Sequence, residues 1–108
     1  MAPRGFEVDR RVGLFRLFGD LDTYTVPSLE AALEDAVAAG GPVVLDVTEL
    51  GFIDSAGVRT LIHTGKSLAS GCLIVHGTRD QVGKVLEISG IERAENIHVT
   101  ACTYERTH

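Results

Sequence analysis

Tryptophan is absent from this chain of 108 residues, and methionine, cysteine and proline are scarce, with one, two and three residues. Basic residues are also few: 10 lysines and arginines stand against 15 aspartates and glutamates, so the formal net charge is −5. Nucleic-acid-binding surfaces need clustered positive charge and, for single strands, aromatic side chains on which bases stack. With four phenylalanines and two tyrosines, the sequence predicts no direct contact with nucleic acid.

The two cysteines, Cys72 and Cys102, form no CxxC pair and no dense disulfide framework. Cys72 lies in the apolar run CLIV, which is typical of a small, reduced core residue. The N-terminus has no hydrophobic signal segment, and no apolar run approaches the roughly 20 residues that a membrane-spanning helix needs. We therefore expect a cytoplasmic protein without direct membrane contact.

Patterns of common enzyme sites are missing as well. The segment GTRDQVGKV (77–85) has five residues between its glycines instead of four, and Val85 stands where a phosphate-binding loop needs serine or threonine. No GxGxxG motif follows a predicted strand, and the four histidines form no HxxxH or His/Cys cluster. A serine preceded by aspartate, as Ser55 is, does not form a nucleophile elbow. We expect no enzymatic activity, no metal ion and no cofactor.

The apolar patterns predict one α/β domain over residues 1–108, with its core at about 6–100 and a short polar tail at 102–108. Strands are expected at 6–9, 12–19, 42–47, 72–77 and 96–101. Helices are expected after Thr25, after Asp54 and around Val82–Leu86, with glycines 40–41, 71 and 90 ending them. The order ββαβαβαβ makes residues 48–53 a connection. Because strands separated by helices need crossovers, we expect a mixed sheet of about five strands with helices mainly on one face.

The stretch FIDSAGVRTLI (52–62) changes to a helical pattern at Asp54 and Ser55. A short polar residue at a helix start accepts hydrogen bonds from free backbone amides, so Asp54 suits an N-cap. Ser55 then takes the first helical position, near the positive end of the helix dipole. A phosphate is compatible with that position and adds about −1.5 to −2 charge. Two interpretations stay open, a simple helix cap and a phosphorylation switch.

The segment GDLDT (19–23) places Asp20, Asp22 and Thr23 between a strand and a helix. In a parallel sheet, the loops that follow strands gather at one end, so this loop is expected near Ser55. It is either an acidic rim beside the serine or a solvated turn.

Three segments in this order, FGDLDTYTVPSLEAAL, VVLDVTELGFIDSAGVRTLI and VGKVLEISGI, resemble the STAS domain family, specifically the bacterial anti-sigma factor antagonists. The resemblance covers about residues 6–100. It depends on a combination of motifs: a Gly-acidic-Leu-Asp loop, a strand ending in Leu-Asp, Asp-Ser-x-Gly at a helix start, and Ser-Gly after the last helix.

The resemblance implies that Ser55 is phosphorylated by an anti-sigma factor that is also an ATP-dependent serine kinase. The unphosphorylated form would bind this partner and release the sigma factor, phosphorylation would abolish binding, and a serine phosphatase would reset the switch. Asp22 matches the loop aspartate beside the phosphosite, Asp54 the residue before the phosphoserine, and Gly57 the small residue that lets the partner approach. The expected partner-binding residues are Asp20, Asp22, Thr23, Asp54, Ser55, Ala56 and Gly57.

The implied protein is a regulator of bacterial transcription, in stress response or sporulation, and is a monomer or a weak dimer. Two features depart from the family pattern. Ala56 replaces a common serine or threonine, and ACTYERTH (101–108) is too short and polar for the C-terminal helix that members often carry. An alternative within the family is a scaffold or accessory subunit of a stress-signalling complex or of a lipid or anion transporter.

A response-regulator receiver is the rival from another class, since Asp46 at the end of a strand could mimic its phosphoacceptor. A receiver, however, also needs paired acidic residues after its first strand, and Asp20 and Asp22 follow a predicted hairpin instead.

Overall fold

The computed structural model describes residues 6–11, 13–69 and 71–101. Two strands, β1 (Glu7–Arg11) and β2 (Leu14–Leu21), are followed by helix α1 (Val26–Ala38). Two further strands, β3 (Val43–Asp46) and β4 (Leu50–Ile53), precede helix α2 (Ser55–Ser67). The last described elements are β5 (Leu73–Thr78), α3 (Asp80–Ser89), a short 3-10 helix η1 (Ile91–Arg93) and β6 (Ile97–Ala101).

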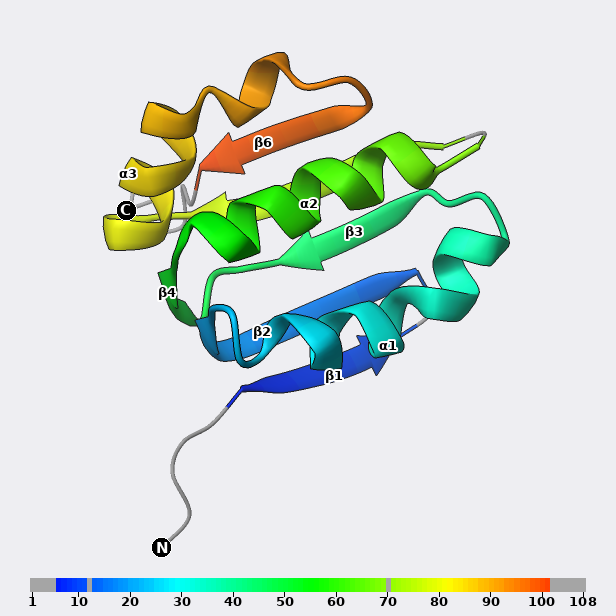
Figure 1. Cartoon of the computed structure of the whole chain (residues 1–108), viewed down its shortest axis with the longest axis horizontal. Coiled ribbons are helices and arrows are strands. Elements are labelled where there is room, and N and C mark those ends of the chain that lie inside the picture. The colour runs from blue at the N-terminus through cyan, green and yellow to red at the C-terminus, as the bar shows by residue number, and fades with distance from the viewer. Residues whose placement is uncertain (1–5, 12, 70, 102–108) are drawn as a thin grey trace, which may run out of the picture.

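The six strands form one mixed sheet, in which five follow the order β1-β2-β3-β5-β6 (Figure 1). β1 pairs antiparallel with β2, whereas β2 with β3, β3 with β5, and β5 with β6 are parallel pairs. The predicted α/β class, the opening hairpin and the mixed sheet are therefore confirmed.

The sixth strand, β4, lies where the sequence indicated only a connection. β2 has eight residues and extends beyond the four-residue β3, so Leu14–Arg16 pair with β3 and Gly19–Leu21 pair with β4. A register shift between Gly19 and Asp20 separates the two pairings. The four residues of β4 are buried, exposed, exposed and buried in turn, so the strand lacks the alternation by which strands are recognised in a sequence.

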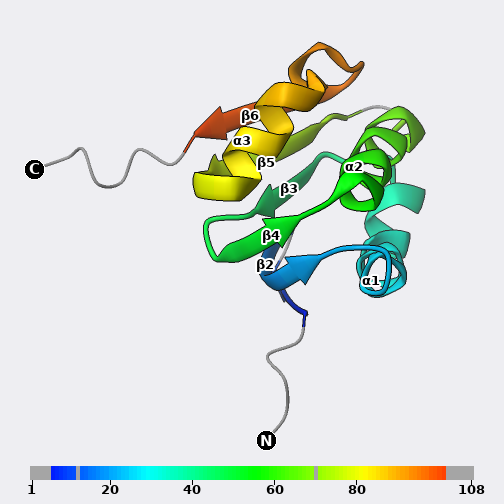
Figure 2. The same cartoon turned by 60° about the vertical axis from the view of Figure 1, so that its left-hand side comes forward.

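The helices cover one face of the sheet, as predicted. Figures 1 and 2 show α1 and α2 side by side on that face. Leu45 and Val75, which lie beneath the helices, have no exposed surface. Val44 and Ile74, their neighbours on the opposite face, are only half-buried. The hydrophobic core therefore lies between the helices and one side of the sheet.

Helix α2 ends earlier than the sequence predicted, at Ser67 instead of just before Gly71. The Asn96 side chain, which precedes β6, donates hydrogen bonds to the carbonyl oxygens of Gly65 and Leu68 at 3.2 and 3.4 Å. A residue distant in sequence thus satisfies carbonyl groups that a helix end leaves free.

Cys72 is half-buried rather than fully buried in the core, while Cys102 and the predicted tail 102–108 lie outside the described residues. None of the described helices has the length and apolar character needed to cross a membrane.

Candidate functional site

Asp54 caps the start of α2, as the sequence predicts. Its Oδ1 atom accepts a hydrogen bond from the backbone amide of Gly57 at 3.0 Å, and its carbonyl oxygen accepts one from the amide of Val58 at 3.0 Å. The side-chain bond satisfies one of the amides that a helix start leaves free. Ser55 is the first helical residue, and its side chain is exposed.

Gly57 is buried and faces the interior of the protein. A Cβ atom added to it would lie 2.7 Å from Cγ1 of Ile53 and 2.8 Å from the carbonyl oxygen of Leu21. Carbon atoms in ordinary contact are about 3.5–4.0 Å apart. The small residue therefore allows α2 to approach the ends of β2 and β4, and the partner-admitting role implied by the resemblance stays a prediction. Ala56, beside it, is half-buried.

Asp22 organises the loop between β2 and α1. Its Oδ1 atom accepts hydrogen bonds from the amides of Tyr24 and Thr25 at 2.9 and 3.1 Å and from the Thr25 hydroxyl at 3.2 Å. That hydroxyl also donates to the carbonyl oxygen of Asp20 at 2.8 Å. Thr25 occupies the predicted N-cap position of α1, but its side chain makes no capping bond to the helix. One carboxylate oxygen of Asp22 is thus engaged within its own loop.

The two candidate segments meet at one end of the sheet. The amide of Asp54 donates to the carbonyl oxygen of Leu21 at 3.2 Å, and Asp20 pairs with Phe52 between β2 and β4. Asp20 and Thr23 are exposed, whereas Asp22 and Asp54 are half-buried. The structure therefore places the acidic loop beside the start of α2.

An apolar groove of about 390 Å³ lies between α2 and α3, and Ser55 forms part of its wall. Besides Ser55, it is lined by Val58, Arg59, Ile62, Val85, Ile88 and Ser89. Ile88 is 77% exposed, which is unusual for a large aliphatic side chain. This groove was not predicted from the sequence. The available signal was the position of Ile88, an apolar residue off the helix face that carries the buried Val82 and Leu86.

Three large hydrophobic side chains are exposed in the described part of the chain, namely Tyr24, Phe52 and Ile88. Tyr24 belongs to the acidic loop, Phe52 precedes Asp54 by two residues, and Ile88 lines the groove with Ser55. Each of them therefore belongs to a segment that adjoins Ser55. Contiguous exposed apolar surface is typical of a protein-binding site, and among the three side chains Ile88 is the one that shares a groove with Ser55.

Asp46 is the last residue of β3. Its Oδ1 atom accepts hydrogen bonds from the hydroxyl and the amide of Thr48 at 2.6 and 3.0 Å, and its Oδ2 atom lies 3.7 Å from Nε of Arg16. Burial by itself raises the pKa of Asp46, but the bonds from Thr48 and the charges of His76 and Arg16 bring this pKa below its ordinary value. The carboxylate thus has a structural role in the turn after β3.

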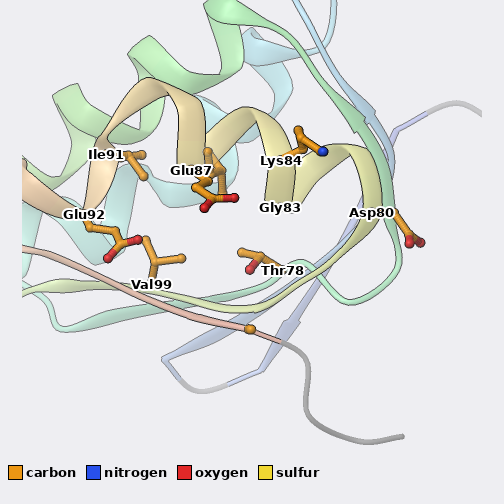
Figure 3. A pocket seen from close by; sticks show the side chains of 10 residues that line it. Thr78, Asp80, Gly83, Lys84, Glu87, Ile91, Glu92 and Val99 are labelled. Atoms are coloured by element: carbon orange, nitrogen blue, oxygen red, sulfur yellow. The ribbon is translucent and has the colours of Figure 1, made fainter.

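A separate cavity of about 570 Å³ lies between α3 and β6 (Figure 3). Glu87, Glu92 and Lys84 line it together with the apolar Ile91 and Val99. Ser55 is not part of its wall. Over the ranges 6–11, 13–69 and 71–101, no group of three or more His, Cys, Asp or Glu side chains is placed to hold a metal ion.

The model of the STAS domain family matches residues 6–101. The anti-sigma-B factor antagonist of Listeria monocytogenes is 33% identical over 76 residues, which cover 68% of this chain and 67% of that protein. The resemblance recognised in the sequence is therefore confirmed.

Two solved structures share the fold. An anti-sigma factor antagonist from Mycobacterium paratuberculosis has a TM-score of 0.69 at 24% identity, over 90% of this chain and 88% of that one. The anti-sigma factor antagonist SpoIIAA in its unphosphorylated form has a TM-score of 0.64 at 22% identity, over 94% and 93% of the two chains. From the family match and the bacterial relative, we conclude that this chain belongs to the STAS domain family.

Proposed function

We propose that this protein is an anti-sigma factor antagonist controlled by phosphorylation of Ser55. Its unphosphorylated form binds an anti-sigma factor that is also a serine kinase, and this binding frees the sigma factor. Phosphorylation of Ser55 abolishes binding, and a serine phosphatase removes the phosphate and restores binding. The protein is a substrate and a binding module without catalysis of its own. The observation that carries the proposal is the exposed side chain of Ser55 at the first position of α2.

The surroundings of Ser55 favour a modifiable hydroxyl. Asp54 supplies the capping bond, so the helix does not need the serine side chain for this purpose. In the part of the chain described by the structure, the Ser55 hydroxyl has no hydrogen-bond partner. A phosphate at a helix N-terminus is favoured by the free amides and by the helix dipole. Phosphorylation is therefore expected to leave the fold intact and to act at the surface.

The charge around Ser55 explains how a phosphate would prevent binding. Asp54 precedes the serine, and the loop with Asp20 and Asp22 lies beside it. A phosphate adds about −1.5 to −2 charge to this acidic surface and places that charge at the edge of an apolar groove. A partner surface that is complementary to the neutral serine would meet this added negative charge and lose its electrostatic complementarity. In a desolvated interface, that loss would cost about 2–5 kcal/mol of binding free energy.

Exposed apolar side chains extend the proposed partner face beyond the two polar segments. Ile88 and Val58 line the groove next to Ser55, and Tyr24 and Phe52 are exposed in the neighbouring segments. Interfaces draw most of their binding energy from a few well-packed side chains near their centre, and tyrosine is among the residue types enriched there. We therefore infer that the partner contacts the groove together with the start of α2.

The first test is a pull-down from the native lysate with Ser55→Ala and Ser55→Asp baits, read by mass spectrometry. We expect an ATP-binding anti-sigma factor with serine kinase activity to be captured by Ser55→Ala and lost with Ser55→Asp. Capture of that kinase equally by both baits would contradict the switch. If both baits instead capture the same transporter or signalling-scaffold proteins, the domain is a docking module of another kind and Ser55 only begins the helix.

A further inference from the structure

Gln81, in the first turn of α3, is joined to Ile53 of β4 by two hydrogen bonds. The amide of Ile53 donates to Oε1 of Gln81 at 3.0 Å, and Nε2 of Gln81 donates to the carbonyl oxygen of Ile53 at 3.0 Å. A paired donor and acceptor of this kind is what a neighbouring strand would supply. The one strand partner of β4 in the described sheet is β2, so the Gln81 side chain takes the place of a strand on the other edge of β4.

The residue that Gln81 holds is the last one before the cap of α2. Ile53 pairs with Leu21 across β2 and β4, and its side chain is only 1% exposed. Asp54 follows directly and positions Ser55 at the helix start. The backbone leading to Ser55 is therefore fixed on one side by β2 and on the other by Gln81.

A second side chain at the start of α3 acts on the same segment. The Nε atom of Arg79 donates to the carbonyl oxygen of Thr48 at 3.0 Å. Arg79 thus holds Thr48, two residues before β4 begins, and Gln81 holds Ile53, the last residue of β4. The same helix supplies Val85 and Ile88 to the groove. One helix therefore orders both the groove wall and the segment that presents Ser55.

We propose that Gln81 is a positioning residue for the phosphorylation of Ser55, an inference that rests on the proposed function. In that reaction the serine oxygen forms a bond to the γ-phosphorus of ATP, the bond from that phosphorus to the bridging oxygen of ADP breaks, and the hydroxyl proton passes to a base of the kinase. The transfer depends on close alignment of the attacking oxygen. Gln81 supplies alignment by fixing the backbone of Ile53, without touching the reacting atoms.

The experiment compares Gln81→Met with Lys84→Met in the full chain. Gln81→Met keeps a long side chain and removes both hydrogen bonds, while Lys84→Met places the same residue on an exposed position of the same helix. Amide hydrogen exchange is followed by NMR in the free protein, and phosphorylation is measured with the kinase captured by the Ser55→Ala bait. Melting temperatures are recorded for both variants.

With Gln81→Met, we expect the amides of Ile53 and Gly57 to exchange about tenfold faster than with Lys84→Met, because two hydrogen bonds are lost locally. The exchange rates of the amides in β3 and β5 should be unchanged. The kcat of phosphorylation should fall about fivefold or more while KM changes little, since alignment rather than binding is lost.

Three outcomes would overturn the inference: equal exchange at Ile53 and Gly57 in both variants, faster exchange over the whole protein, or an unchanged kcat despite a locally loosened segment. The failure of the proposed function looks different. In that case no kinase phosphorylates wild-type Ser55, and the positioning role falls with it, whereas the exchange data still decide whether Gln81 fixes the segment.

Discussion

The Oδ1 atom of Asp54 accepts a hydrogen bond from the amide of Gly57 at 3.0 Å, so the residue before Ser55 is also the cap of α2. The amide of Asp54 in turn donates to the carbonyl oxygen of Leu21 at 3.2 Å. The start of the helix is thereby attached to the end of β2. Substitutions at this junction can therefore separate what stabilises the helix from what binds the partner.

Asp54→Ala is expected to lower the free energy of unfolding by about 1 kcal/mol, because the amide of Gly57 loses its acceptor. Asp54→Asn should retain most of the stability, since its side-chain oxygen can still accept that bond. Urea unfolding of the two variants measures the difference. An equal loss in both would mean that the charge, and not the capping bond, stabilises the helix start.

Gly57→Ala is expected to lower the free energy of unfolding by about 1–3 kcal/mol, because its Cβ would overlap Ile53 and Leu21. Gly51→Ala is the matched control: a Cβ there would have its nearest neighbour at 3.7 Å, and the residue is exposed. Denaturant titrations compare the two. A similar loss of unfolding free energy in both variants would show that the close approach of α2 to β2 and β4 does not cause the destabilisation.

Ser55→Asp is expected to keep or raise the free energy of unfolding, by about 0.3–1 kcal/mol, because a negative charge at a helix N-terminus is favourable. Ser67→Asp places the same charge on an exposed serine at the other end of α2 and should be destabilising by a similar amount. Thermal unfolding at low salt checks this, and added salt should reduce both effects. Strong destabilisation by Ser55→Asp would argue that phosphorylation acts by disrupting the fold.

Ile88→Gln is expected to weaken binding of the captured anti-sigma factor by about tenfold, because an apolar side chain of the groove is lost. Its effect on the free energy of unfolding should stay within about 0.5 kcal/mol, since Ile88 is largely exposed. Lys84→Gln, also exposed on α3, is the control and should bind like the wild type. Affinities are measured by isothermal titration calorimetry. Unchanged affinity with Ile88→Gln would remove the groove from the partner face.

Asp46 is expected to make stability depend on pH. Its pKa is lowered in the folded state, so its contribution is present above the pKa of the unfolded chain and is lost as the pH falls through the folded value. The difference in the free energy of unfolding between wild type and Asp46→Asn should therefore be largest near neutral pH and become smaller below about pH 4. Urea unfolding along a pH series measures it.

Thr48→Val serves as the companion variant for this pH series. It removes the hydroxyl that donates to Asp46 at 2.6 Å but keeps the carboxylate and a side chain of similar shape. The acid-dependent part of the stability should become smaller in this variant. A difference between wild type and Asp46→Asn that does not vary with pH would contradict the role given to the carboxylate.

The features predicted correctly from the sequence depend on residues close together along the chain. Asp54 caps α2 because its side chain reaches an amide three residues later, and the apolar period of α2 needs only successive turns of one helix. The family resemblance also rests on short motifs, such as Asp-Ser-x-Gly. The phosphorylation of Ser55 stays a prediction.

Other features depend on contacts between segments that are far apart in the sequence. β4 exists as a strand because β2 extends beyond β3 and offers it free backbone groups, which no pattern in Leu50–Ile53 reveals. Gln81 reaches Ile53 across 28 positions, and Asn96 ends α2 from a similar distance.

The sequence by itself thus determined the α/β class, the capped start of α2 and the family. Only the tertiary structure decided that Ile53 and Leu21 pack against Gly57, where the groove beside Ser55 lies, and that α3 holds the segment before the serine. The physical reason is that caps and helical periods are satisfied within a few residues, whereas grooves, close approaches and side-chain pairing of a strand edge arise only when distant elements pack together.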